Sequence, residues 1–114
     1  MSAITTHVLD LVAGLPAAGL AVSLSRRDPG ESWVHLANGR TDDDGRASDL
    51  LPEGGLGAPG TYRLSFQVGE YFAARGEPTF YPEVDITFAV EDSAGHYHVP
   101  LLLSRFGYST YRGS

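Results

Sequence analysis

Short apolar segments separated by turn-forming residues run along the whole chain. The segments are rich in Val, Leu, Thr, Tyr and Phe, and 14 glycines and 7 prolines interrupt them at short intervals. This pattern is typical of many short β-strands and favours an all-β sandwich. We expect strands, each bounded to within about 2 to 4 residues, at Ile4–Asp10, Leu20–Arg26, Trp33–Arg40, Thr61–Val68, Val84–Val90, Tyr97–Ser104 and Gly107–Tyr111.

The segments between these strands carry residues that fit turns and loops. The run DDDG at residues 42–45 offers a glycine where φ can be positive, and RDPG at residues 27–30 predicts another tight reversal. The stretch 51–60 holds 2 prolines and 4 glycines, so we expect a loop there. One or two helical turns are expected at Glu70–Arg75, where Gly76 supplies a stop.

Length and composition indicate one globular domain spanning residues 1–114. A chain of 114 residues with 42% hydrophobic and 19% charged residues can bury a single core. The 8 basic and 14 acidic residues give a net charge of −6, so the chain lacks the excess of basic residues that is typical of nucleic-acid binding. The absence of cysteine excludes disulfides, thiol nucleophiles and Cys-ligated zinc.

The apolar runs are too short to cross a membrane. The longest, Val8–Gly14, is interrupted by Asp10 and falls well below the roughly 20 residues that a spanning helix needs. The first residues show no basic segment followed by an apolar core, which a secretory signal would have. We therefore expect a cytoplasmic protein with no membrane partner.

Two clusters raise the question of a metal site. Asp42–Asp44 offers carboxylates to calcium, but the downstream Glu of a calcium loop is missing, and Asp and Gly are what a solvated β-turn prefers. His96 and His98 would share one face of a strand, yet no third ligand stands at a recognisable spacing. We favour the interpretation in which one histidine caps a loop after Gly95 and the other lines a pocket. No metal and no cofactor are expected.

The C-terminal segment is unusually aromatic for a chain end. Phe106, Tyr108 and Tyr111 cluster where a terminus is commonly frayed and polar, so we expect these rings to be buried. Either they add a last strand to the sheet or they meet another chain.

Five motifs together resemble the transthyretin-related 5-hydroxyisourate hydrolases, in the right order and over nearly the whole chain. Each motif alone is weak, but their joint occurrence is specific. The motifs are HVLD at 7–10 with GLPA at 14–17, TDDDGR at 41–46, FYPEV at 80–84, HVPLLLS at 98–104 and YSTYRGS at 108–114.

The resemblance implies a transthyretin-like β-sandwich of two four-stranded sheets with one short helix, assembled as a homotetramer. The expected helix at Glu70–Arg75 falls where the family has one. One local departure is Arg105-Phe106, where the family commonly has Pro-Tyr, and it affects the turn after the penultimate strand.

The reaction that the resemblance implies is the hydrolysis of the lactam of 5-hydroxyisourate, a product of urate oxidation. His7, Arg46 and His98 carry over as catalytic residues, and Tyr111, Arg112, Gly113 and Ser114 as substrate-binding residues. A neutral histidine can take a proton from water, and an arginine suits a planar substrate and its developing oxyanion. We prefer His7 as the base with His98 assisting, and a positioning role for Ser114.

Two other functions compete with hydrolysis. A transthyretin-like carrier would bind a small ligand without catalysis, because one fold can host several functions. A β-sandwich interaction module with a weak His-X-His metal site would take up metal and show no turnover. The two histidines, Arg46 and the YRGS tail occur together in the hydrolases and are absent as a set from the carriers, so the hydrolase interpretation is favoured.

Overall fold

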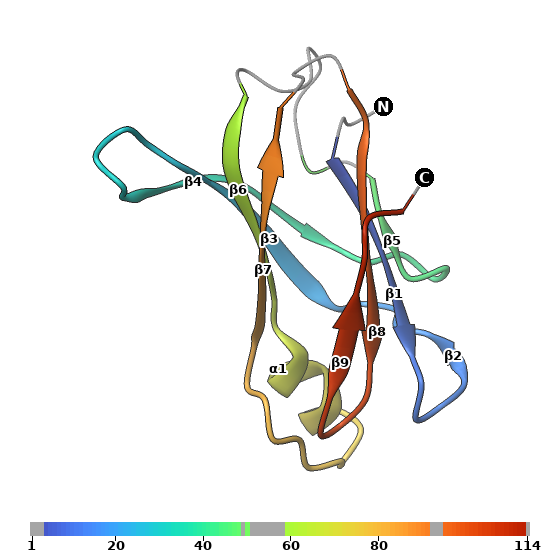
Figure 1. The fold of residues 1–114 in the computed structure, drawn as a ribbon. Coiled ribbons are helices and arrows are strands. Elements are labelled where there is room, and N and C mark those ends of the chain that lie inside the picture. Colours follow the sequence, from blue (N-terminus) through green and yellow to red (C-terminus); the bar gives the residue numbers. More distant parts are fainter. Residues whose placement is uncertain (1–3, 49, 51–58, 92–94, 114) are drawn as a thin grey trace.

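The computed structural model describes residues 4–48, 50, 59–91 and 95–113, which form two β-sheets packed face to face (Figure 1). A short helix, α1 (Val68–Ala73), closes one end between β6 and β7. The first sheet has five strands: β2 (Leu15–Pro16), β1 (Ile4–Asp10), β8 (Tyr97–Leu103) and β9 (Tyr108–Thr110) in that order, with β5 (Arg46–Ala47) also paired to β1. The second has the order β4 (Trp33–Arg40), β3 (Ala21–Arg27), β6 (Gly60–Phe66) and β7 (Val84–Val90).

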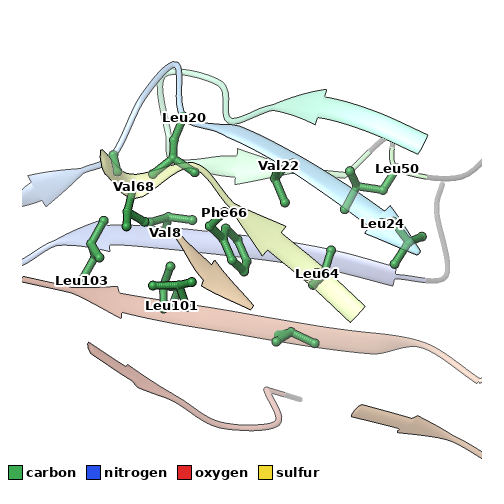
Figure 2. Close-up of a cluster of buried hydrophobic side chains, with 14 of the residues drawn as sticks. Val8, Leu20, Val22, Leu24, Leu50, Leu64, Phe66, Val68, Leu101 and Leu103 are labelled. Carbon is green, nitrogen blue, oxygen red and sulfur yellow. The ribbon is translucent and has the colours of Figure 1, made fainter. Parts of the chain in front are cut away.

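Alternation along the strands decides which side chains enter the core. In β1, Ile4, Thr6 and Val8 are at most 1% exposed, whereas Thr5 and His7 belong to the opposite face. Figure 2 shows the apolar side chains from both sheets meeting between the layers, among them Val8, Leu64, Phe66 and Leu101. The core therefore fixes β1 and β8 as rigid central strands and leaves their other face open.

The expected strands agree closely with the observed ones. The bounds of Ile4–Asp10, Trp33–Arg40 and Val84–Val90 are identical, and the other four differ by at most two residues at either end. The helix begins at Val68 and ends at Ala73, two residues earlier than expected. Of the expected loop at 51–60, residues 51–58 lie outside the described residues, and Gly60 already belongs to β6.

The first sheet has five strands, one more than the resemblance implies, and two of them are absent from the strands expected from the sequence. Its additional members, β2 and β5, have two residues each and both pair antiparallel with β1. Two residues cannot show an alternating pattern, so these strands exist because the neighbouring β1 offers hydrogen-bonding partners. The expected all-β sandwich is confirmed, with sheets of five and four strands.

The expectation that the C-terminal aromatic rings are buried is wrong for the single chain. Phe106, Tyr108 and Tyr111 are 61%, 41% and 58% exposed. Tyr108 does belong to a last strand, and its ring packs edge-on against Tyr81 with centroids 5.3 Å apart. In the part of the chain that the structure describes, β9 is an edge strand that pairs only with β8.

Within the described ranges, no helix is long and apolar enough to cross a membrane.

Candidate active site

The outward face of the five-stranded sheet brings three of the predicted residues together. His7 of β1 pairs with Arg46 of β5, and two residues earlier Thr5 pairs with His98 of β8. Residues paired across neighbouring strands share a face, so Arg46, His7 and His98 lie on adjacent rows of one surface.

The C-terminal tail joins the same surface. After β9 the chain continues along β8 towards the start of β1 (Figure 1), and Gly113 forms a β-bridge to His98. The backbone N–H of Gly113 donates to the carbonyl of His98 over 2.8 Å. We call the set His7, Arg46, His98 and Gly113 the outer-face cluster.

A tight turn places Arg46 beside His7. Asp42 Oδ1 accepts the backbone N–H groups of Asp44 and Arg46 at 2.9 and 3.0 Å, and Gly45 adopts a φ of 78°. The Asp42 carboxylate thus organises the turn itself, as an Asx turn does. This geometry agrees with the turn interpretation of the acidic run.

The hydrogen bond of His7 fixes its tautomer. Its Nε2 lies 2.9 Å from the carbonyl oxygen of Asp44. A carbonyl can only accept, so Nε2 carries the proton, and in the neutral ring Nδ1 holds the lone pair. The same turn that presents Arg46 therefore also orients His7.

His98 is half-buried between β1 and the tail. Its Nδ1 lies 2.8 Å from Thr5 Oγ1, which directs Nε2 away from β1. Removal of the ring from water, followed by the nearby His7, Arg46 and His96, lowers the pKa of His98 below its ordinary value. The neutral, proton-accepting form of His98 is therefore favoured at neutral pH.

Tyr111 and Arg112 are exposed and border a cavity. They line a space of about 330 Å³ with His98, Thr110 and the edge of β7. Arg112 also stacks on Tyr97, its guanidinium carbon 4.7 Å from the ring centroid. His98 thus belongs to the outer-face cluster and also lines this cavity, as expected for the histidine that lines a pocket. Ser114 lies outside the described residues.

Two neighbours of His98 were not singled out as site residues. The sequence motifs do not single out Thr5, and for His96 the sequence favours the role of a loop cap. In the structure the Nε2 atom of His96 lies 3.3 Å from Thr5 Oγ1, so both histidines contact one hydroxyl. Among the described residues no group of three or more His, Cys, Asp or Glu could hold a metal ion.

Comparison with known proteins identifies the family. The model of the HIUase/Transthyretin family matches residues 4–113. The chain belongs to the HIUase/Transthyretin family. Its members include the 5-hydroxyisourate hydrolase of Caulobacter vibrioides, which is 52% identical over 118 aligned residues that cover all of both chains.

Solved structures of this family share the fold. The 5-hydroxyisourate hydrolase of Klebsiella pneumoniae matches with a TM-score of 0.84 and 36% identity, covering all of this chain and 94% of that one. Transthyretin from Sparus aurata matches with a TM-score of 0.91 at 30% identity, covering 99% and 97%. The chain thus shares its backbone with a hydrolase and with a transthyretin, while its sequence identity to these two hydrolases is higher than to that transthyretin.

Proposed function

We propose that this protein hydrolyses 5-hydroxyisourate, opening its lactam towards the ureidoimidazoline that precedes allantoin in urate degradation. The similarity to named hydrolases over the full chain supports the reaction. The observation that carries the proposal is the outer-face cluster, because it joins two histidines and an arginine on one rigid sheet surface.

Lactam hydrolysis makes three demands that this cluster meets without a metal or cofactor. A base must take a proton from water as its oxygen attacks the carbonyl carbon. A cation must stabilise the charge that develops on the carbonyl oxygen. A proton must reach the nitrogen when the C–N bond breaks.

His98 is the base in this proposal and, in its Nε2-protonated form, returns the proton to the nitrogen, while His7 orients the substrate. The lowered pKa of His98 favours its neutral ring, and Gly113 of the tail packs directly against that ring. The preference for His7 as the base stays an untested prediction. The assignment to His98 is supported by its lowered pKa, whereas the bond from Nε2 of His7 to Asp44 orients that ring and leaves its Nδ1 lone pair to accept from the substrate.

Arg46 stabilises the oxyanion. Its side chain is exposed, and the register places it on the row of His7. The guanidinium presents a planar set of donors that can bind the edge of a urate-like ring through two parallel hydrogen bonds.

The tail binds the substrate in this proposal. Gly113 lets the backbone approach His98, while Tyr111 and Arg112 line the adjoining cavity. Ser114 would add a hydroxyl or a terminal carboxylate that positions the substrate or its water.

Assembly into a homotetramer would cover the apolar groups that this chain leaves exposed. Among them are Leu11, Val12 and Leu15 around β2, and Phe106, Tyr108 and Tyr111 at the C-terminal end. Such groups are enriched at subunit interfaces. Light scattering should therefore report four times the 12.2 kDa chain mass, and a 12.2 kDa species at micromolar concentration would contradict a tetramer. We also propose that the protein is located in the cytoplasm.

The competing function is a carrier, since a transthyretin solved with thyroxine shares the fold at a TM-score of 0.90. The deciding experiment adds the protein to freshly generated 5-hydroxyisourate and follows its ultraviolet absorbance. If the protein hydrolyses 5-hydroxyisourate, the decay rate should increase in proportion to the protein concentration. A saturable, stoichiometric binding signal with an unchanged decay rate would favour the carrier instead.

A further inference from the structure

We propose that Thr5 and His96 form a proton relay that connects Nδ1 of His98 to solvent. This inference rests on the proposed function, because it assigns a path for the proton that His98 takes from water. Thr5 and His96 act through His98 and touch no reacting atom, so they are positioning residues for the reaction.

The geometry of the relay is a single hydroxyl between two imidazoles. Thr5 Oγ1 lies 2.8 Å from Nδ1 of His98 and 3.3 Å from Nε2 of His96. A hydroxyl has one proton to donate and two lone pairs with which to accept. It can therefore donate to one ring only while it accepts from the other, and the three groups must be polarised in one direction at a time.

The two directions correspond to the two states that His98 needs. When Thr5 donates to His96, Nδ1 of His98 carries a proton and Nε2 holds a free lone pair, which is the base form. When Thr5 donates to His98, Nε2 of His98 carries the proton, which is the acid form. Reversing the polarity of the hydroxyl thus converts the base into the acid without moving a heavy atom.

The protons balance in each transfer along the relay. As Nε2 of His98 takes a proton from water, its Nδ1 proton passes to Thr5 Oγ1. The proton that Thr5 held passes to Nε2 of His96, which becomes an imidazolium and releases its Nδ1 proton to solvent. Each group ends with the number of protons that it had before, except for the water, which has become hydroxide bound to the substrate carbon.

The most exposed member of the relay is His96, at its end. Thr5 is only 8% exposed and His98 is half-buried, whereas His96 is exposed. The relay therefore begins at a half-buried ring beside the tail, passes through a buried hydroxyl and ends at a ring in contact with water.

The adjacent threonine shows what a structural hydroxyl in this strand looks like. Thr6 faces the core, is 1% exposed and donates to the carbonyl of Val99 over 2.6 Å. That hydroxyl satisfies one backbone acceptor and has no titratable neighbour among its described contacts. Thr5, one residue earlier and on the opposite face, contacts two titratable rings.

The charges around His98 favour release of its proton. His7 on β1, Arg46 on β5 and His96 next to β8 all oppose a positive charge on the ring, and Arg112 of the tail lies on the adjoining cavity. A proton taken up at Nε2 is thus pushed towards solvent, and the relay supplies the route.

The test uses isosteric removal and restoration of the hydroxyl. Thr5→Val deletes the hydroxyl at nearly constant side-chain shape, and Thr5→Ser keeps it. His96→Gln replaces the last group of the relay by one that cannot take up a proton. Thr6→Val and His35→Gln are the matched controls, since Thr6 faces the core and the exposed His35 contacts Asn38 on the other sheet.

For Thr5→Val and His96→Gln we expect kcat to fall about 10-fold or more, in keeping with the contribution of general acid–base catalysis, at unchanged KM. Thr5→Ser should retain most of kcat. His96→Gln should also move the acid limb of the pH profile upward, because a group that opposes charge on His98 is lost. Both controls should keep the pH profile of the unaltered protein.

A second readout needs no substrate. Nitrogen NMR of the imidazoles reports which nitrogen of His98 is protonated, and we expect Thr5→Val, but not Thr5→Ser or Thr6→Val, to change it. Wild-type kcat in Thr5→Val would overturn the relay, as would an unchanged His98 spectrum. An unaltered protein that does not hydrolyse 5-hydroxyisourate would instead contradict the proposed function. The NMR result would then still show whether Thr5 connects the two histidines by hydrogen bonds.

Discussion

Gly113 lies directly against the imidazole of His98. A Cβ built on Gly113 would stand 2.5 Å from Cδ2 of the ring, closer than real side chains approach, and 3.3 Å from Cγ of Pro100. The backbone hydrogen bond from Gly113 to His98 holds the tail in this position. A glycine is therefore required for the tail and the histidine to occupy their places together.

Gly113→Ala should separate the tail from His98 and lower kcat/KM by about 10- to 100-fold, since displacements of about 1 Å have such effects in active sites. Gly107→Ala is the control, because a Cβ at Gly107 meets nothing within 4 Å. Steady-state kinetics of both variants checks this. Equal loss in the two, or none in Gly113→Ala, would show that close packing on His98 is unimportant.

Arg46→Lys should not behave as a conservative change. Lysine keeps the charge but loses the planar pair of donors, so we expect kcat/KM to fall on the order of 10- to 100-fold. Arg27→Lys, on the other sheet, controls for a general effect of replacing arginine. If Arg46→Lys keeps its activity within twofold of wild type, Arg46 does not stabilise the oxyanion and is only a turn residue.

The rate should depend on pH through His98. The neutral ring is the active form, and its lowered pKa means that more acid is needed to protonate it. The acid limb of kcat/KM should therefore have its midpoint below the ordinary histidine value of about 6.5. Circular dichroism at each pH shows whether the fold persists. A profile flat between pH 8 and 5, or a midpoint above 7, would exclude His98 as the base.

Tyr71→Phe should lower stability while sparing catalysis. Tyr71 donates to Oδ2 of the buried Asp10 over 2.8 Å, and burial together with this bond raises the pKa of Tyr71 to about 12. Asp10 Oδ1 accepts the backbone N–H groups of Val12 and Ala13 in the β1–β2 turn. Losing one donor to a buried carboxylate costs about 1–3 kcal/mol, which urea denaturation would detect. An unchanged unfolding midpoint would contradict this role, and the exposed Tyr108→Phe serves as the comparison.

Most of the fold could be predicted from the sequence because the long strands alternate and end at turn residues. β1, β4 and β7 match residue for residue. β2 and β5 could not be predicted, since a two-residue strand has no pattern of its own and depends on a partner distant in the sequence.

The site could be predicted only in part. The motifs nominated His7, Arg46, His98 and Gly113, and the structure brings them to one surface. Thr5 and His96 depend on the parallel register of β1 and β8, which joins residues 93 positions apart. Nothing local in the sequence specifies that register, so their contact with one hydroxyl appears only in the folded chain.

The most direct measurement compares the decay of freshly generated 5-hydroxyisourate in buffer, with the unaltered protein and with the His98→Asn and His7→Asn variants. The account predicts rapid decay with the unaltered protein and decay close to the buffer rate with His98→Asn, although the variant remains folded by circular dichroism. A buffer rate in the presence of the unaltered protein, or a full rate with His98→Asn, would contradict it.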